Sequence, residues 1–599
     1  MEKVAILDCG GQYTKVIDRK VRECLVDSEI LAVSVDAGAL EGFSGIILTG
    51  GPESVWEENS LRPDPRIFEL GIPILGICYG MHLVAAHFGG VVASNVKKEY
   101  GEADIEIDNS VPLFDGLGAA ETVLMSHGDS VSAVPAGFVV CGRSGNVTAA
   151  ICDAARRVHA VQFHPEVDLT INGMKIFENF LRKICGIKDV YSLENRLNTA
   201  VSRVREVAGD RAVIVLVSGG VDSAVTAEIL LRALPPDNII AVHVDHGLMR
   251  KNESDGICDV LQRGGLKRLI RIDAKDVFFA KLAGVSDPEK KRAIIGETFI
   301  TELQNEVDKL ELDLNSTFLA QGTLRPDLIE SGNPDISASA AKIKTHHNDV
   351  DIIRTLRDKG LVIETNYDWH KDEVRKIAKM LGLTDEIANR QPFPGPGLGV
   401  RLLCGDGTKT VSANENEKLT EFLKNERFSG CILPVSSVGV QGDKRTYKEL
   451  AALYSDTPAY DWDELYSLAR NITNNFPFIN RVAYAAGGHN GIEKAVSHSM
   501  YVCDESVNLL REIDNIVTER LKDKKISQTF AVLLPVGYTK KYSVAIRTFV
   551  TNDFMTGRPY ALPFARLNAL AEEIKKGFSE IEYVFYDITA KPPATCEWE

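Results

Sequence analysis

The chain has 599 residues, of which 44% are hydrophobic and 25% charged, and its formal net charge at pH 7 is −16. This length exceeds that of one ordinary domain and indicates several hydrophobic cores. The negative charge argues against a nucleic-acid partner, because binding a phosphate backbone requires clustered Lys and Arg. No apolar run reaches the roughly 20 residues that cross a bilayer, and the N-terminal residues lack a signal-peptide pattern, so we expect a cytosolic protein without a membrane partner.

Residues 1–190 alternate short apolar runs with helical patterns, which is typical of an α/β domain with a largely parallel sheet. The alternation restarts over 195–395 and predicts a second doubly wound α/β domain. Residues 396–599 combine β-branched runs with a long helical stretch, which predicts a smaller α+β domain. We find neither an internal repeat nor a low-complexity linker, so we expect the three parts to pack together.

A cysteine lies at the centre of a sharp turn, GICYG at 76–80, between an apolar strand and a helix. Flanking glycines permit the strained turn of a nucleophile elbow, which would project the side chain of Cys78 into a cleft. The N-terminus of the following helix would favour the thiolate. A lone cysteine is more often a core residue, so this interpretation needs a base nearby.

The segment VQFHPEV supplies that base as His164, with Glu166 two residues later. Residues i and i+2 of an extended segment face the same side, so Glu166 can orient the imidazole toward the thiol of Cys78. The backbone amides of Gly51 and Tyr79 are the expected donors of an oxyanion hole.

Four short motifs in order resemble the class I glutamine amidotransferases: GGP at 50–52, GICYG at 76–80, SHGD at 126–129 and FHPE at 163–166. The resemblance implies hydrolysis of glutamine to glutamate and ammonia through a thioester on Cys78, with His127 and Asp129 positioning glutamine. It also shows a departure, because His82 stands where this family commonly has a glutamine, four residues after the nucleophile.

A glycine-rich loop, SGGVDS at 218–223, links an apolar strand to an apolar helix. Its amides, its two serine hydroxyls and the helix N-terminus would form an anion nest. The loop lacks the Lys with which a Walker loop serves γ-phosphate transfer. We therefore expect it to hold pyrophosphate as a leaving group, so that AMP is transferred.

The expected ATP-binding residues of this loop are Ser218, Gly219, Gly220, Val221, Asp222 and Ser223. The loop looks like the signature of the N-type ATP pyrophosphatases. In that family the acidic residue, here Asp222, is a candidate ligand for the Mg²⁺ that accompanies ATP, because a hard cation prefers carboxylate oxygen.

Motifs along nearly the whole chain are similar to the glutamine-hydrolysing GMP synthases, among them KKRAIIGETF at 290–299, RQPFPGPGL at 390–398, SVGVQGDKRTY at 437–447 and KPPATCEWE at 591–599. The resemblance implies that ATP, glutamine and xanthosine 5′-monophosphate (XMP) are the substrates. XMP would be adenylated by ATP, which yields pyrophosphate, and then aminated to GMP with release of AMP. The C-terminal domain is expected to complete the XMP site and to mediate homodimer contacts.

The same resemblance assigns two sets of residues. Contacts to XMP are implied for Arg292, Asp443, Gln528, Lys591 and Glu597. A lid over ATP and its magnesium is implied for Asp327, Glu330, Lys344 and Lys371. The cations of the first set suit a nucleotide phosphate, and its carboxylates can accept from ribose or base donors.

Two alternatives remain open. The chain could be another adenylating amidotransferase or a tRNA-modifying enzyme with a similar loop, although its acidic charge weighs against RNA. It could also be a nucleotide-sensing or scaffold protein that has kept the fold and lost the chemistry. That alternative predicts a broken triad or loop, whereas Cys78, His164, Glu166 and SGGVDS are all intact.

Overall fold

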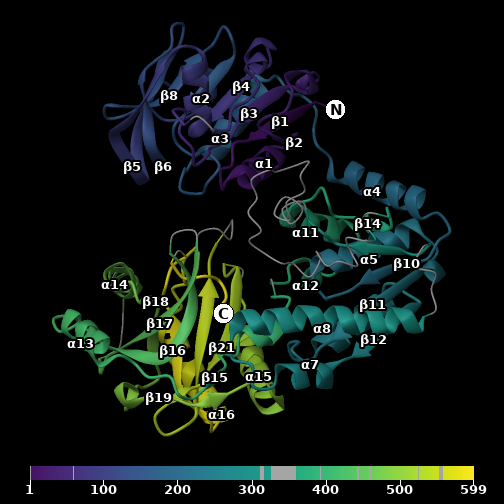
Figure 1. The fold of residues 1–599 in the computed structure, drawn as a ribbon, viewed down its shortest axis with the longest axis vertical. Coiled ribbons are helices and arrows are strands. Elements are labelled where there is room, and N and C mark those ends of the chain that lie inside the picture. The colour runs from purple at the N-terminus through teal and green to yellow at the C-terminus, as the bar shows by residue number, and fades with distance from the viewer. Residues whose placement is uncertain are drawn as a thin grey trace. The chain divides into compact units, whose positions relative to one another are not determined.

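The computed structural model describes residues 2–57, 60–310, 316–324, 356, 359–391, 393–441, 444–457, 461–523, 525–551, 557–591 and 593–599. By its internal contacts the chain divides into two compact units (Figure 1). Unit 1 consists of Met1–Ala200, Thr323–Asp351 and Asn366–Ile377, and unit 2 of Val201–Gly322, Ile352–Thr365 and Ala378–Glu599. The domain boundaries near residues 190 and 395 stay a prediction.

Unit 1 contains a nine-stranded sheet with the order β2-β1-β3-β4-β9-β8-β7-β5-β6. Its parallel half comprises β2 (Asp27–Ala32), β1 (Lys3–Asp8), β3 (Gly45–Leu48), β4 (Ile74–Ile77) and β9 (Val158–Val161). Its antiparallel half comprises β8 (Val147–Asp153), β7 (Val139–Ser144), β5 (Val91–Ile107) and β6 (Ala120–Ala133). The alternation of the sequence predicted the parallel half and not the antiparallel extension.

Helices cover both faces of this sheet: α1 (Thr14–Glu23), α2 (Tyr79–His87) and α3 (Gly173–Glu178). Successive side chains of a strand point to opposite faces. Accordingly, Ile6 packs in one core with Ile17 of α1 and Phe177 of α3, whereas Leu7 packs in another core with Met81 of α2. The two cores confirm the doubly wound α/β fold.

Unit 2 contains a five-stranded parallel sheet formed by β12 (Arg268–Asp273), β11 (Ile239–Asp245), β10 (Val213–Leu216), β13 (Phe318–Gln321) and β14 (Val362–Glu364). Its helices include α5 (Val221–Ala233), α6 (Glu253–Arg263), α7 (Lys275–Leu282), α8 (Pro288–Lys309) and α12 (Asp385–Ala388). Two further helices, α4 (Leu193–Ala208) and α11 (Lys371–Met380), contribute residues to both units.

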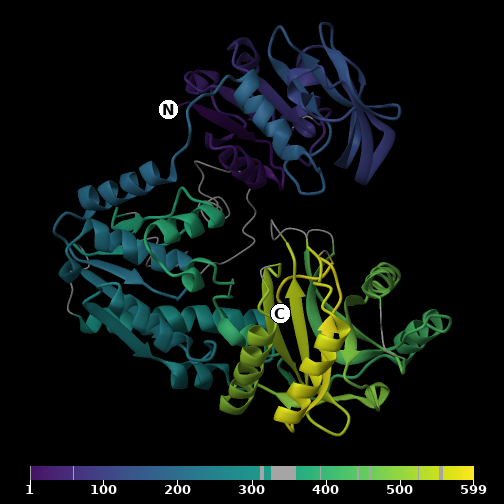
Figure 2. The same cartoon turned by 180° about the vertical axis from the view of Figure 1, so that it is seen from behind.

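The rest of unit 2 is built on a six-stranded mixed sheet formed by β16 (Ser429–Gln441), β17 (Lys444–Tyr454), β18 (Ile479–Ala486), β24 (Ile581–Asp587), β23 (Tyr542–Phe549) and β21 (Gln528–Leu534). Its helices are α13 (Ala413–Phe422), α14 (Trp462–Asn475), α15 (Asp504–Arg520) and α16 (Phe564–Gly577). Figure 2 shows α16, in yellow, lying across this sheet. One hydrophobic core joins Leu248, Leu398, Leu510 and Ile546, so the two sheets of unit 2 share a core.

The six-stranded sheet contains two copies of one arrangement, helix-strand-strand-helix-strand. The first copy is α13-β16-β17-α14-β18 and the second is α15-β21-β23-α16-β24. In each copy the first two strands are antiparallel and the third is parallel to the second, and the two third strands pair antiparallel at the centre. The sequence did not predict this structural repeat. The copies share only short stretches, such as ILPV at 432–435 and LLPV at 533–536, which do not stand out in the sequence.

None of the helices that the structure describes is long and apolar enough to cross a bilayer.

Candidate active sites

Cys78 lies between β4 and α2 in a strained backbone conformation, with φ 53° and ψ −105°. A positive φ is uncommon for a residue other than glycine. The turn depends on its two glycines, because a Cβ on Gly76 would lie 2.6 Å from the carbonyl oxygen of Gly80, and one on Gly80 would lie 2.3 Å from that of Leu48. The local sequence thus produces the elbow that holds the thiol at the start of a helix.

His164 and Glu166 follow β9 and are buried beside this thiol. The Nδ1 of His164 donates to the Oε1 of Glu166 at 2.7 Å, and the imidazole lies beside the thiol of Cys78. Burial opposes a charge on the imidazole, but the Glu166 carboxylate and the Cys78 sulfur together raise the pKa of His164 to about 10. The geometry brings the three predicted residues together and favours an imidazolium at neutral pH.

Replacing Glu166 with glutamine should shift the pH dependence of glutamine hydrolysis. The raised pKa of His164 means that its partners stabilise the protonated imidazole. The ring loses this proton only as pH rises through about 10. Without the carboxylate, deprotonation occurs at lower pH, so the basic limb of kcat/KM should move down by about one unit or more. Glutaminase rates between pH 6 and 10.5 measure this shift. Glu178→Gln, at an exposed position on α3, is the control, and an unmoved basic limb in Glu166→Gln would show that Glu166 does not set the charge of His164.

The predicted oxyanion-hole residues, Gly51 and Tyr79, also lie together. A Cβ on Gly51 would be 3.1 Å from the ring of Tyr79 and 2.4 Å from the carbonyl oxygen of Cys9, so only glycine fits there. Tyr79 is the first residue of α2, where a backbone amide has no acceptor within the helix. Gly51 therefore lies beside the residue that follows the nucleophile, and the role of the two amides stays a prediction.

The residues predicted to position glutamine lie on β6, next to the same thiol. The Sγ of Cys78 is 3.8 Å from the carbonyl oxygen of Ser126, immediately before His127. His127 donates from Nδ1 to the carbonyl oxygen of Asp129 at 2.9 Å, and Ser54 donates to the Asp129 carboxylate at 2.6 Å. The antiparallel half of the sheet thus contributes one side of the site.

The sequence analysis missed Gln162, which is fully buried and also contacts the nucleophile. Its Nε2 donates to the Sγ of Cys78 at 3.8 Å. The i+2 rule that linked His164 to Glu166 applies equally in the other direction, from His164 back to Gln162. That spacing was the signal by which Gln162 could have been found.

In unit 2, the loop at 218–223 joins β10 to α5 at the carboxyl edge of the parallel sheet. Gly219 has φ 82°, a conformation that favours glycine, and Gly220 precedes the first helical residue, Val221. Ser223 donates to the carbonyl oxygen of Gly220 at 3.0 Å, and Asp222 lies in the first turn of α5. The loop therefore lies between a strand and a helix N-terminus, and its binding of an anion stays a prediction.

Two further residues at this loop escaped the sequence analysis. Arg390 donates from Nη1 to the carbonyl oxygen of Gly219 at 2.6 Å and pairs with Glu253, which places a cation beside the loop that lacks a Walker Lys. Gln321, at the carboxyl end of β13, has both polar side-chain atoms buried without a hydrogen-bond partner among the described residues. Such atoms are rare in folded proteins and often face a ligand or water.

The C-terminal tail brings together several of the residues implied for XMP. Arg401 holds Glu597 with two parallel hydrogen bonds, Nε to Oε2 and Nη2 to Oε1, both 3.1 Å, and Gln528 donates to Oε1 at 3.2 Å. Arg292 of α8 donates to the backbone oxygen of Glu599. The sequence analysis did not single out Arg401, which is fully buried against the ring of Phe530.

Lys591 starts this tail and forms a bridge with Gly557, with backbone hydrogen bonds of 2.9 and 3.2 Å. The other residues predicted for XMP and for the lid, Asp443, Asp327, Glu330 and Lys344, lie outside the described residues.

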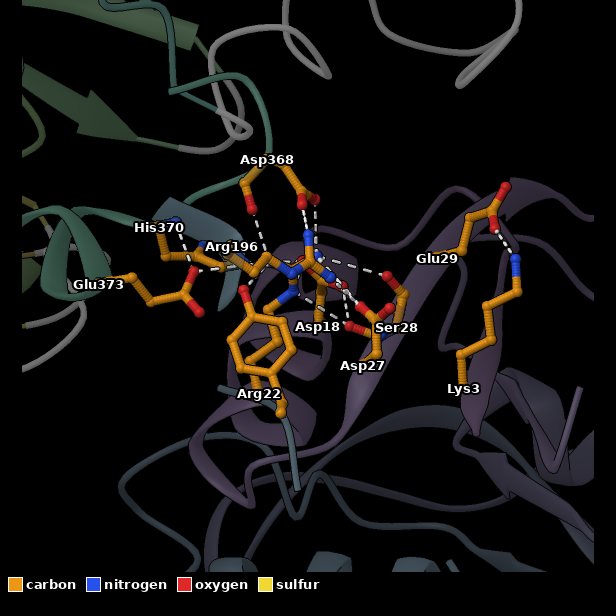
Figure 3. Close-up of polar contacts among 11 residues, drawn as sticks. Lys3, Asp18, Arg22, Asp27, Ser28, Glu29, Arg196, Asp368, His370 and Glu373 are labelled. Atoms are coloured by element: carbon orange, nitrogen blue, oxygen red, sulfur yellow. Dashed lines mark hydrogen bonds and ion pairs between the residues drawn. The ribbon is translucent and has the colours of Figure 1, made fainter. Parts of the chain in front are cut away.

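The remaining lid residue, Lys371, begins α11 next to a buried network of charges in unit 1 (Figure 3). Arg22 of α1 donates to the carboxylate of Asp368 at 2.9 Å. His370 lies 2.7 Å from the carboxylate of Asp18, which also accepts from Ser28. These contacts join the segment before α11 to α1, and removing one member would leave a buried charge without its partner, which is destabilising.

Comparison with known proteins gives two family matches. Residues 5–184 match the family described as Glutamine amidotransferase class-I, and residues 515–598 match the GMP synthase C terminal domain. The glutamine-hydrolysing GMP synthase of Dictyostelium discoideum is 40% identical over 678 residues, which covers 100% of this chain and 94% of that protein. The one from Listeria innocua is 41% identical over 505 residues, which covers 81% of this chain and 95% of that protein.

Proposed function

Since the chain belongs to the glutamine-hydrolysing GMP synthases, ligases that take nitrogen from glutamine, we propose that it aminates XMP through an adenylyl intermediate. ATP would be cleaved to AMP and pyrophosphate, and ammonia would come from the site at Cys78. The observation that carries this proposal is the presence in one chain of a thiol–imidazole–carboxylate triad and a glycine loop without a Walker Lys. The triad would supply the nitrogen, and the loop would support the adenylation that makes the XMP oxygen a leaving group.

The first reaction is hydrolysis of glutamine. The Cys78 thiolate attacks the carboxamide carbon, and the amides of Gly51 and Tyr79 stabilise the oxyanion. The His164 imidazolium, held by Glu166, donates its proton to the departing ammonia, which leaves a thioester. Water then adds to the thioester with His164 as the base, releasing glutamate and restoring the thiol.

The second reaction is adenylation. The loop amides and α5 bind the β- and γ-phosphates of ATP, so that the C2 oxygen of XMP attacks the α-phosphorus and pyrophosphate leaves. Asp222 offers the carboxylate oxygen that a Mg²⁺ ion bound with ATP would take, and that ion would neutralise charge on the pyrophosphate. Arg390 beside Gly219 supports the same role, because it adds a fixed positive charge at this loop.

Binding of XMP is proposed to use the C-terminal tail. Glu597 would accept hydrogen bonds from the base, and Gln528 and Arg401 fix the orientation of its carboxylate. Arg292 and Lys591 would meet the phosphate, and Asp443 the ribose. Closure over ATP is proposed for Asp327, Glu330, Lys344 and Lys371.

Ammonia then attacks C2 of the adenylated XMP, and AMP departs with the former C2 oxygen. Without adenylation that oxygen would be a very poor leaving group. Ammonia is mostly protonated at neutral pH, so release beside the intermediate keeps it concentrated and neutral.

Product analysis with XMP carrying oxygen-18 at C2 tests this proposal. Complete reactions should form GMP, AMP and pyrophosphate in equal amounts, and the label should appear in the phosphate of AMP. Omission of ATP, glutamine or XMP in turn identifies the reactants that each product requires. Formation of ADP and phosphate, or recovery of the label in water, would refute adenylation.

A further inference from the structure

The Sγ of Cys78 has another buried polar neighbour besides His164 and the carbonyl oxygen of Ser126. The side chain of Gln162 donates from Nε2 to this sulfur at 3.8 Å, and its Oε1 lies 2.8 Å from the Nε2 of His82. Gln162 is fully buried and His82 is 4% exposed. The three side chains therefore form a buried chain of hydrogen bonds from α2, through the residue that follows β9, to the elbow.

The direction of this chain follows from the chemistry of its members. An amide oxygen can only accept, so the Nε2 of His82 must carry the proton that is donated to Gln162. Burial lowers the pKa of His82, which keeps the imidazole neutral with a single N–H. With the oxygen of Gln162 engaged by His82, its NH₂ group is turned to the sulfur.

An N–H donor aimed at a sulfur favours the thiolate over the thiol, because the hydrogen bond to the charged form is stronger. Rotation of the amide by 180° would instead present an oxygen lone pair to the sulfur, which disfavours the thiolate. His82 lies on the first turn of α2, four residues after Cys78. Through the orientation of the Gln162 amide it therefore affects the stability of the Cys78 thiolate.

We propose that Gln162 stabilises the thiolate of Cys78 and that His82 is a positioning residue that keeps the Gln162 amide in the required orientation. This inference rests on the proposed role of Cys78 as the nucleophile. It also gives a reason for the departure at His82, where the resemblance to the amidotransferases implied a glutamine.

Alkylation of Cys78 in the full-length protein tests the proposal without turnover. The rate of modification by iodoacetamide is measured between pH 5 and 10 and followed by mass spectrometry of the peptide that contains Cys78. The charged or titratable groups near these side chains are His164 and Glu166 at the sulfur, and Asp129 and His127 at His82. They are left unchanged in every variant.

Gln162→Leu removes the charge-assisted hydrogen bond to the sulfur, and His82→Leu frees the Gln162 amide to rotate out of it. Each variant should therefore move the midpoint of the alkylation curve upward by about one pH unit. His82→Gln should keep the original midpoint, because its amide can also donate to Gln162. His87→Leu is the matched control, since this histidine is on the same helix and is exposed. Gln162→Met, which retains the side-chain length, replaces Gln162→Leu if that variant does not fold.

An unchanged midpoint in the folded Gln162 variant would overturn the role of Gln162. Equal shifts in His82→Gln and His82→Leu would overturn the positioning role of His82. If the proposed role of Cys78 as the nucleophile is wrong, Cys78→Ala would retain glutamine-dependent synthesis, whatever the alkylation curves show.

Discussion

Replacing Cys78 with alanine should abolish glutamine-dependent GMP formation and leave the ammonia-dependent reaction intact. The thiol is the only nucleophile of the proposed triad, and loss of such a group typically lowers kcat by roughly 10⁴-fold or more. The loop proposed to serve adenylation belongs to unit 2, whereas Cys78 belongs to unit 1, so added ammonium should still aminate adenylated XMP. Initial rates of GMP formation with glutamine or with ammonium chloride measure the two activities.

Cys24→Ala is the matched control for this experiment. Burial raises the pKa of Cys24 to about 12, so its thiol stays protonated and should not replace Cys78. Both nitrogen sources should support normal rates in this variant. Equal loss of the two activities in Cys78→Ala would contradict a division of labour between the two units.

The motifs that could be predicted from sequence are those whose geometry is set by a few consecutive residues. The elbow at Cys78 needs only its flanking glycines and the strand and helix on either side. The link from His164 to Glu166 follows from the two-residue period of an extended segment. Likewise, the loop at 218–223 is defined by its own glycines and by α5.

Contacts between distant residues could not be predicted in this way. Arg401 and Glu597 are 196 positions apart, and Gln162 and His82 are 80 apart, so no local pattern pairs them. In both cases one partner was recognised as notable and the other was missed. Only the tertiary structure shows which distant polar groups meet, although most buried polar groups do have a hydrogen-bond partner.

The sheets show the same limit. Alternating apolar runs predicted parallel strands covered by helices, because each strand of such a sheet is buried on both faces. The repeated arrangement of the six-stranded sheet depends on which strands pair, for example β18 with β24. Pairing between strands about 100 residues apart leaves little local signal.

Replacing Gly219 with alanine should impair GMP formation from either nitrogen source and spare glutamine hydrolysis. Cys78→Ala should instead abolish glutamine hydrolysis and spare the ammonia-dependent reaction. Gly219 has φ 82°, which costs about 1–2 kcal/mol for a residue with a Cβ, and that Cβ would lie 2.2 Å from the Cδ1 of Ile257 and 3.2 Å from an Nη of Arg390. Relief of this strain would move the loop amides and the guanidinium that are proposed to bind the phosphates of ATP. GMP formation from glutamine and from ammonia should then fall together, by roughly 100-fold if about 3 kcal/mol of transition-state stabilisation is lost.

Glutamine hydrolysis at Cys78, assayed without XMP, should persist in Gly219→Ala, because the thiol and its partners are untouched. Gly256→Ala is the control: this glycine precedes Ile257 on α6, and a Cβ there would meet no atom within 4 Å. This control tests whether any added methyl group near α6 lowers activity. We expect normal activity, because alanine favours a helix more than glycine does. Retention of normal ammonia-dependent synthesis in Gly219→Ala would mean that the phosphates of ATP do not depend on this loop, and the adenylation site would have to be placed elsewhere in the chain.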